Sequence, residues 1–207
     1  MTKLEKIVIA THNPAKIQRF KDALLKVTDN ILTLADLGIT VEAEETGLTA
    51  EENAKIKALF YAKLTGLPVF SHDSALYVDF LPADNQPGVN VRRINGKEAT
   101  DDELFDHWKT IIIKAPEEKR IGKWHSAYCL ATPDGTMNLF AIDHPRQFFW
   151  PPSEKRIVGW PLDSMMGPCG FNKPCSELTD EEREEAHKEA DDVLAEKIPE
   201  FFRQVNR

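Results

Sequence analysis

The amino-acid sequence predicts an α/β fold in which a mixed β-sheet is flanked by helices. At the start of the chain the β-branched run "KIVIAT" (residues 6–11) is followed by a polar turn and by "AKIQRFKDALLKV" (15–27), which has a helical period. A second helix is followed by the apolar run Pro68–Phe70, and residues 125–143 have the pattern of a β-hairpin. Since 207 residues suit one domain, we expect residues 1–207 to form a single domain.

The composition is that of an ordinary globular protein, with 42% hydrophobic and 29% charged residues. The net charge of -8 argues against a nucleic-acid partner, which usually needs a basic face, but it allows a nucleotide ligand. No apolar run reaches the roughly 20 residues of a membrane span, and the apolar start is too short for a secretory signal. The cysteines, Cys129, Cys169 and Cys175, lack a C-x-x-C pair, so we expect reduced thiols and a cytoplasmic protein.

The first strand–turn–helix unit has the geometry of an anion site. Asn13-Pro14 separates the strand from the helix. The amides of this turn and the N-terminus of the helix then point to one place. The apolar positions that give this helix its period are Ile17, Phe20, Leu24 and Val27. Residues 31–41 are expected to be extended, with a turn at Gly38.

The second helix is expected to begin at Thr49, because Thr49 and Glu52 fit a capping box, and to end at Gly66. Asn53 and Lys57 are four residues apart and therefore share a face of this helix. An apolar stripe beside that face is expected to point to the core, leaving the polar pair at its edge. The stripe consists of Ile56, Leu59 and Phe60.

In the second half of the chain, loops alternate with predicted helices and strands. A loop rich in proline and glycine spans residues 82–96 and contains two adjacent arginines, the first being Arg92. Capping boxes open helices at Thr100 and Thr179. Between these helices, residues 144–174 are rich in proline, glycine and aromatic residues without a period, and a long irregular stretch is a candidate for function.

Polar side chains follow two predicted strands, at residues 11–13 and at residues 71–74. Ligands of α/β sheets gather beyond the carboxyl ends of strands, and Glu44-Glu45 with the Asn53/Lys57 face add carboxylates and an ammonium. Such groups suit a metal–polyphosphate complex. Each signal also has an ordinary structural explanation as a cap, an exposed bend or a solvated lysine. The residues alone therefore indicate a nucleotide or phosphate site and no more.

Longer motifs make the prediction more specific. The segment "IATHNPAKIQRF" matches T/S-x-N-x-x-K, and "EETGLTAEENAKIKALFYAKLTGLPVFSHDSAL" follows E-T-G-x-T-x-x-E-N-A-x-x-K-A and then D-D-S-G-L. "QPGVNVRRINGKEATDD" is similar to a P-G-x-x-S-A-R loop, and "GWPLDSMMGPCGFNKPCSEL" keeps the spacing of G-F-G-Y-D-P. Ala186-His187-Lys188 stands in place of Ser-His-Arg. Together these motifs resemble the inosine/xanthosine triphosphate pyrophosphatase family over nearly the whole chain.

The resemblance implies an enzyme that hydrolyses deaminated purine nucleoside triphosphates (ITP, dITP and XTP) to the monophosphate and pyrophosphate. It also implies an elongated α/β fold with two lobes around a central cleft, and a homodimer. Asp73 would be the catalytic residue, and Glu45 and Asp73 would hold Mg²⁺. The residues implied to bind substrate are Thr11, Asn13, Lys16, Lys57, Ser74, Trp160, Asp163, His187 and Lys188.

The sequence departs from the family at the metal site. His72 replaces the first of two adjacent acids, which should weaken binding of Mg²⁺, while an imidazole better suits Mn²⁺. A histidine that only hydrogen-bonds beside the site is the other interpretation, and the one we favour. Ala75 replaces a glycine, which indicates an altered local turn.

The residues that read the base depart further. Pro161 and Leu162 replace Gly-Tyr, and Lys188 replaces an arginine whose planar fork a lysine does not reproduce. Glu182 stands where the family has a lysine, with Arg183 beside it. We therefore expect an altered or relaxed base preference. The alternatives are a catalytically impaired nucleotide-binding protein on the same fold and a hydrolase of another nucleotide.

Overall fold

The computed structural model describes residues 6–26 and 28–205. The chain forms two compact units, each assembled from separate segments. Unit 1 comprises Met1–Asp73, Ser126–Ile142 and Lys188–Arg207, and unit 2 comprises Ser74–His125 and Asp143–His187. The expected single domain over residues 1–207 stays a prediction.

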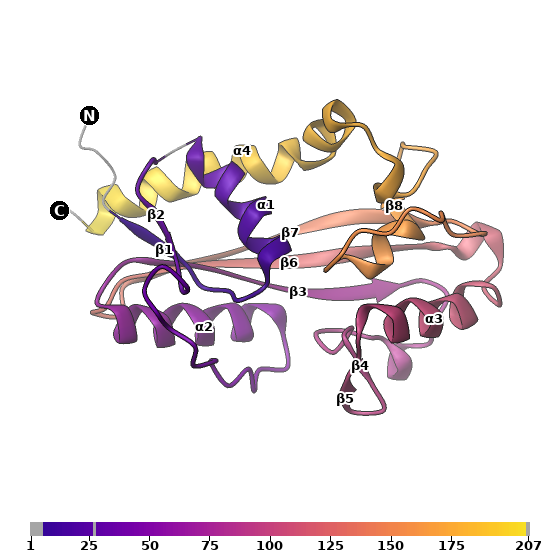
Figure 1. The fold of residues 1–207 in the computed structure, drawn as a ribbon, viewed down its shortest axis with the longest axis horizontal. Coiled ribbons are helices and arrows are strands. Elements are labelled where there is room, and N and C mark those ends of the chain that lie inside the picture. The colour runs from indigo at the N-terminus through magenta and orange to yellow at the C-terminus, as the bar shows by residue number, and fades with distance from the viewer. Residues whose placement is uncertain (1–5, 27, 206–207) are drawn as a thin grey trace. The chain divides into compact units, whose positions relative to one another are not determined.

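A six-stranded mixed sheet has the strand order β2-β1-β3-β6-β7-β8, which confirms the predicted α/β class (Figure 1). β1 pairs in parallel with both β2 and β3, while β7 and β8 are antiparallel. The strands are β1 (Ile7–Ile9), β2 (Ile31–Thr33), β3 (Val69–Val78), β6 (Ile121–Ala131), β7 (Met137–Phe148) and β8 (Met166–Pro168). The turn of the predicted hairpin lies between β6 and β7, as expected.

Unit 1 is built around a core between β1, β3, β6 and the helices α1 (Pro14–Leu25) and α4 (Asp180–Val205), the latter from Lys188 onward. Phe20 of α1 packs against Phe70 of β3 with ring centroids 5.2 Å apart. Val27, the last position of the predicted apolar stripe of α1, lies outside the described residues. The remaining core side chains include Ile7, Ile9, Leu24, Leu130, Leu194, Ile198 and Phe201.

The prediction that the strand after Pro68 ends at Ser71 is wrong, because β3 continues to Val78. Alternation along a strand sends neighbouring side chains to opposite faces of the sheet, so polar residues can be placed within a strand. Ser71 donates a hydrogen bond to the carbonyl of Ala54 in α2. His72 points the other way and packs on Phe20. The polar run therefore lies inside a continuous strand and supplies both faces.

The predicted core stripe of α2 (Ala50–Thr65) is also wrong. Phe60 is 37% exposed, whereas Asn53 and Lys57 are 4% and 8% exposed. Small side chains accompany the buried polar pair and let the helix lie close to the sheet: Ala54, Ala58 and Ala62. Lys57 and Asn53 are buried because each finds a hydrogen-bond partner there. The predicted capping box at Thr49 and the end at Gly66 are confirmed.

Unit 2 has its own core around the helix α3 (Asp101–Ile112), which includes Leu104, Trp108 and Ile112. The capping box predicted at Thr100 is present. The two-stranded sheet of β4 (Arg93–Ile94) and β5 (Lys97–Glu98) precedes α3 (Figure 1). Short 3-10 turns complete the unit: η1 (Ala83–Asn85), η2 (Glu117–Lys119), η3 (Pro161–Ser164) and η4 (Cys175–Glu177).

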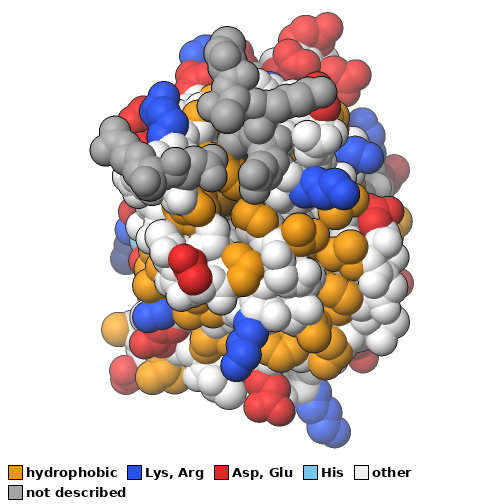
Figure 2. Space-filling model, turned by 90° about the vertical axis from the view of Figure 1, so that its left-hand side faces the viewer, with side chains coloured by type: hydrophobic (Ala, Val, Ile, Leu, Met, Phe, Trp, Pro, Cys, Tyr) orange, Lys and Arg blue, Asp and Glu red, His pale blue; other side chains and the backbone are white. Residues whose placement is uncertain are grey.

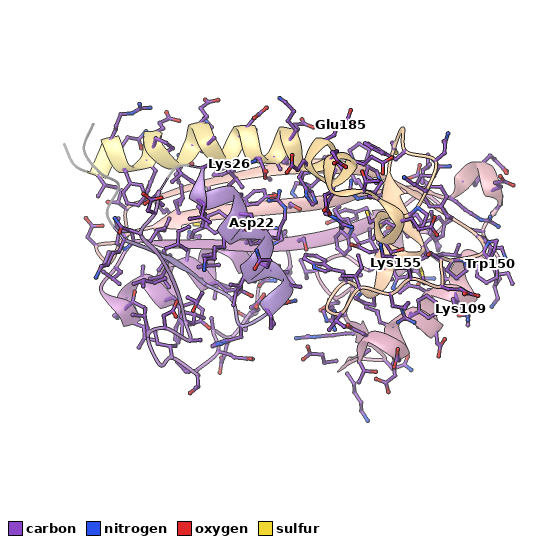
Figure 3. The ribbon with its side chains drawn as sticks, turned by 45° about the horizontal axis from the view of Figure 1, so that its top comes forward. Asp22, Lys26, Lys109, Trp150, Lys155 and Glu185 are labelled. Atoms are coloured by element: carbon purple, nitrogen blue, oxygen red, sulfur yellow. The ribbon has the colours of Figure 1, made fainter. Side chains whose placement is uncertain are left out.

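An ion-pair cluster in unit 1 ties α1 to α4. Asp191 of α4, whose side chain is 10% exposed, accepts from Arg19 at 2.6 Å and from Lys26 at 2.8 Å. Figure 3 labels Lys26 near the end of α1, beside α4. Burial raises the pKa of Asp191, but the contacts with Lys26 and Arg19 outweigh it and leave this pKa below its ordinary value. The folded state therefore favours the ionised form of Asp191 over the neutral acid.

We expect Asp191→Asn to lower the free energy of unfolding by about 2 kcal/mol at neutral pH, because both cations lose their partner. The folded-state pKa is depressed, so the contribution is present above the ordinary aspartate pKa and is lost as pH falls through the folded-state value. Urea unfolding at several pH values checks this. Asp192→Asn, with an exposed carboxylate, is the control, and a difference that persists at acid pH would contradict the assignment.

One face of the molecule carries charged and apolar side chains side by side (Figure 2). Figure 2 shows one face on which lysine, arginine, aspartate and glutamate side chains are scattered among apolar ones, so neither sign of charge dominates that face. Cys129, Cys169 and Cys175 are free, as predicted. Among residues 6–26 and 28–205, no helix has the length and apolar character needed to cross a membrane.

Candidate active site

A buried lysine lies between two carboxylates in unit 1. The Nζ atom of Lys57 donates to Oε2 of Glu45 at 2.8 Å and to Oδ1 of Asp73 at 3.0 Å. The side chains of Lys57 and Asp73 are 10% and 12% exposed, and that of Glu45 is 40% exposed. We call these three residues the carboxylate–lysine centre. One ammonium balances only part of two carboxylate charges, so the centre retains a negative charge.

The loop before α2 brings Glu45 to this centre. Asn53 accepts a hydrogen bond from the backbone N–H of Gly47 at 2.8 Å, and Glu52 accepts from Leu48 at 2.6 Å. A Cβ at Gly47 would lie 2.6 Å from the Cβ of Glu52, closer than side chains approach, so only glycine fits this turn. The buried Asn53 therefore fixes the loop, while Lys57, one turn further along the same face, holds the carboxylate that the loop carries.

The donors in this centre suit a hard divalent cation. Carboxylate oxygens are the ligands that Mg²⁺ prefers, and Mg²⁺ is usually bound by one or two carboxylates together with water and substrate phosphates. Glu45 and Asp73 supply two such groups. Among the described residues, no group of three or more histidine, cysteine, aspartate and glutamate side chains forms a ready-made metal site. Glu45 and Asp73 alone therefore fit a divalent cation that takes its other ligands from water or from phosphate oxygens.

His72 lies on the opposite face of β3 from Asp73. Its ring packs between Phe20, at 4.8 Å between centroids, and Tyr128, at 5.0 Å. Asp73, the next residue in β3, turns toward α2 and Lys57 instead. The alternation of the strand separates the two side chains, which favours the interpretation of His72 as a neighbour of the site over the alternative of a metal ligand.

The turn before α1 carries the residues predicted to hold phosphate. Asn13 caps the helix, since its Oδ1 accepts from the N–H of Ala15 at 2.9 Å and of Lys16 at 3.3 Å. The hydroxyl of Thr11 accepts from the N–H of Asn13 at 3.2 Å. Thr11, Lys16 and His72 line a recess between β1, β3 and α1. The side-chain oxygens of Thr11 and Asn13 thus shape the turn, and the phosphate role of these residues stays a prediction.

A second polar group lies in unit 2, around η3. Trp160 precedes this turn, and Asp163 lies within it. Burial raises the pKa of Asp163 to about 6, and the nearby charges of Arg146 and Arg183 lower it only in part. Arg183 donates to the carbonyl of Cys175 at 3.3 Å, and burial raises the pKa of that cysteine to about 12. A recessed carboxylate beside two guanidinium groups can pair with a ligand that carries both a donor and an acceptor.

We expect Asp163→Asn to stabilise the protein at pH 8 and to leave its stability at pH 4 nearly unchanged. The folded-state pKa lies above the ordinary value of 3.8, so the wild type loses stability as pH rises from about 4 to 6. The gain from the substitution is up to about 3 kcal/mol. Thermal unfolding across this pH range measures it. Equal stability of both proteins at pH 8 would show that Asp163 is not held in a desolvated site.

The other predicted substrate residues lie on β3 and α4. Ser74 is half-buried in β3 of unit 2. His187 is half-buried on α4. Lys188 is exposed and pairs with Asp192 at 2.7 Å, which raises the pKa of the lysine. The substrate roles assigned to these residues stay predictions.

Arg146 and Arg183 were not among the predicted site residues. Sequence comparison drew attention to Glu182, but Glu182 pairs with Lys173 at 2.6 Å. Arg183, one position further along α4, is close enough to Asp163 for its charge to lower the pKa of that carboxyl, as the charge of Arg146 also does. Neighbouring positions on a helix point about 100° apart, so the sequence did not decide whether Arg183 replaces the cation that the family has at position 182. The signal that could have found it is the presence of an arginine next to the position where a cation is expected.

Comparison with known proteins places these observations in a family. The sequence profile of the Ham1 family matches residues 7–191. The chain is 36% identical over 187 residues to a dITP/XTP pyrophosphatase of Mesorhizobium japonicum, covering 86% of this chain and 82% of the relative. A crystal structure titled nucleoside-triphosphatase / dITP/XTP pyrophosphatase, from Mycobacterium abscessus, superimposes with a TM-score of 0.69 at 30% identity over 94% of this chain and 99% of that chain.

A HAM1 protein from Coxiella burnetii superimposes with a TM-score of 0.73 at 26% identity, over 93% of this chain and 100% of that chain. Sequence and structure therefore agree, and the resemblance predicted from the motifs is confirmed. The chain therefore belongs to the Ham1 family, and the dITP/XTP pyrophosphatases compared with it are similar to it over most of its length.

Proposed function

We propose that this protein hydrolyses deaminated purine nucleoside triphosphates, such as ITP, dITP and XTP, to the nucleoside monophosphate and pyrophosphate. The observation that carries the proposal is the carboxylate–lysine centre, in which Lys57 is buried between Glu45 and Asp73. A family relative named dITP/XTP pyrophosphatase, 36% identical to this chain, supports the substrate class. The reaction removes nucleotides that would otherwise enter nucleic acid in error.

In the proposed reaction, water attacks the α-phosphorus and the bond between that phosphorus and the bridging oxygen to the β-phosphate breaks. Pyrophosphate leaves with that oxygen, and the proton of the water passes to Asp73, whose Oδ1 is held by Lys57. Lys57 then faces the negative charge that develops on the phosphate oxygens, without having to reorganise. Thr11, Asn13, Lys16 and Ser74 would hold the phosphates.

Glu45 and Asp73 would hold Mg²⁺, with Mn²⁺ as the alternative. The cation would screen phosphate charge and make bound water more acidic. Its proposed ligands are oxygens of both carboxylates together with substrate oxygens. His72 is not among these ligands, since it packs with Phe20 and Tyr128.

The base would be read in unit 2. Trp160 would stack on it, and Asp163 would accept its ring N–H while Arg183 donates to its carbonyl oxygen. Deamination converts an adenine amino group to a carbonyl and places a proton on the neighbouring ring nitrogen, which matches a carboxylate beside a guanidinium. His187 and Lys188 are the remaining proposed contacts. Because Pro161 and Leu162 alter this segment, we propose a broader base preference than strict selection of ITP.

Release of pyrophosphate from a panel of nucleoside triphosphates tests the proposal. The panel contains ITP, XTP, dITP and the ordinary ribo- and deoxyribonucleoside triphosphates, each with Mg²⁺ and with Mn²⁺. Release from ITP or XTP is the expected result. Comparable turnover of ATP or GTP supports the broader preference, while sharp selection of ITP overturns that part. Binding of nucleotide without any release would instead establish a catalytically impaired nucleotide-binding protein.

We further propose a homodimer in the cytoplasm. The free cysteines fit a reducing compartment, where nucleotide pools are also found. Light scattering during gel filtration measures the assembly directly. A mass equal to the single-chain value of 23.5 kDa would overturn the dimer.

A further inference from the structure

The first turn of α3 holds the segment that carries Trp160. The carboxylate of Asp101, at the start of α3, accepts a hydrogen bond from the backbone N–H of Gly159 at 2.7 Å through Oδ2. Its other oxygen, Oδ1, accepts from Nη2 of Arg92 at 2.8 Å. One side chain therefore joins the loop before α3 to the irregular segment that follows β7, all within unit 2.

The hydrogen bond from Gly159 fixes the backbone immediately before Trp160. Gly159 has a φ of +82°, a conformation that side-chain-bearing residues rarely adopt. The backbone N–H of Trp160 in turn donates to the carbonyl of Ile157 at 3.0 Å, and the backbone N–H of Asp163 donates to the carbonyl of Trp160 at 3.1 Å. The turn is thus closed on itself, and the side chain of Asp101 anchors it to α3.

Arg156 adds a second tether between the same two elements. Its guanidinium lies 3.6 Å from the ring centroid of Phe105 in α3, and Nη2 approaches the carbonyl of Asp101 at 3.4 Å. Figure 3 labels Lys155, its neighbour on the segment, and Lys109 on α3. The segment is therefore held at Arg156 and at Gly159, and Trp160 follows directly.

Arg92 favours the ionised form of Asp101. Burial raises the pKa of Asp101, but the hydrogen bonds from Arg92 and Gly159 outweigh it, so this pKa lies below its ordinary value. A charged acceptor makes a stronger hydrogen bond to a backbone N–H than a neutral one does. Arg92 thus favours the form of Asp101 that accepts more strongly from Gly159.

We infer that Asp101, supported by Arg92, is a positioning residue that sets the orientation of Trp160 and through it the recognition of the nucleotide base. The inference rests on the proposed function for its consequence in catalysis, because the role of Trp160 as the base platform belongs to that proposal. The positioning itself rests on the contacts of Asp101 with Gly159 and Arg92.

A spectroscopic test addresses the positioning without any substrate. The full chain is labelled with 5-fluorotryptophan, and the ¹⁹F resonance of Trp160 is assigned by its loss in Trp160→Phe. Asp101→Ala should shift or broaden this resonance, and Asp101→Asn, which keeps an acceptor for Gly159, should restore it in part. Asp106→Ala is the matched control, since Asp106 lies on α3 with a side chain that is 76% exposed. An unchanged Trp160 resonance in Asp101→Ala overturns the inference.

Kinetics test the consequence. Asp101→Ala should raise KM for ITP by about tenfold and change kcat by less than about twofold, because base binding is lost while the carboxylate–lysine centre is intact. Inhibition by inorganic triphosphate, which has no base, should be unchanged. An equal loss for both molecules overturns the inference. If the wild type releases no pyrophosphate, the proposed function fails, and the fluorine spectrum still decides whether Asp101 positions Trp160.

Discussion

Asp73→Asn is expected to lower kcat for pyrophosphate release by about three orders of magnitude while the protein stays folded. The amide keeps the shape of the carboxylate, but it cannot take a proton from water and is a poor ligand for a divalent cation. Lys57 retains Glu45 as a partner at 2.8 Å, so no buried cation is left alone. The loss should therefore appear in turnover and much less in stability.

Steady-state release of pyrophosphate measures the effect, and thermal unfolding shows whether the fold persists. Glu44→Gln is the control, because Glu44 precedes Glu45 in the same loop and is exposed. Turnover that is unchanged in Asp73→Asn would remove Asp73 from the mechanism. Loss of turnover together with collapse of the fold would give this residue a structural role instead.

Lys57→Met is expected to lower both activity and stability. Without the ammonium, Asp73 keeps a charge at a position where its side chain is only 12% exposed, which costs about 3 kcal/mol of folding free energy. Turnover should fall by about a hundredfold, because the cation that would meet the phosphate charge is missing. The methionine side chain matches the length of the lysine stem, so the packing of this side chain between α2 and the sheet is largely kept.

Urea unfolding and pyrophosphate release measure the two effects separately. Lys55→Met is the matched control, since Lys55 lies on α2 and is exposed. If Lys57→Met unfolds like the wild type, the buried carboxylate does not depend on this lysine. If its turnover is also normal, the carboxylate–lysine centre is not the catalytic site.

Much of the fold could be predicted because local signals and tertiary structure agree. Thr49 and Thr100 cap helices where their sequence patterns indicate. Asn13 both ends the first strand–turn unit and caps α1, as expected from the Asn-Pro pair. The two carboxylates and the lysine of the candidate site were likewise all named from sequence, and the structure brings them within hydrogen-bonding distance.

The predictions were wrong where contacts between distant parts of the chain decided which side chains are buried. Phe60 has the more apolar side chain, yet Lys57 is buried, because Asp73 and Glu45 pair with its charge on the inner face of α2. A sequence does not show these partners in advance. The length of β3 was missed for a related reason, since the polar run at 71–74 finds its hydrogen bonds in α2 and its ring contacts in α1. Arg183 was left undecided because one helical step separates it from Glu182.

The way unit 1 is assembled has a consequence for synthesis of the chain. Its core combines Phe20 and Phe70 with Leu194 and Phe201, which are separated by well over a hundred positions along the chain. A growing polypeptide therefore cannot complete this core until the segment from Lys188 onward has left the ribosome. Until then, the apolar faces of α1 and β3 lack their final cover. Products of premature termination within α4 should accordingly be substrates for proteases and chaperones, whatever catalytic residues they already contain.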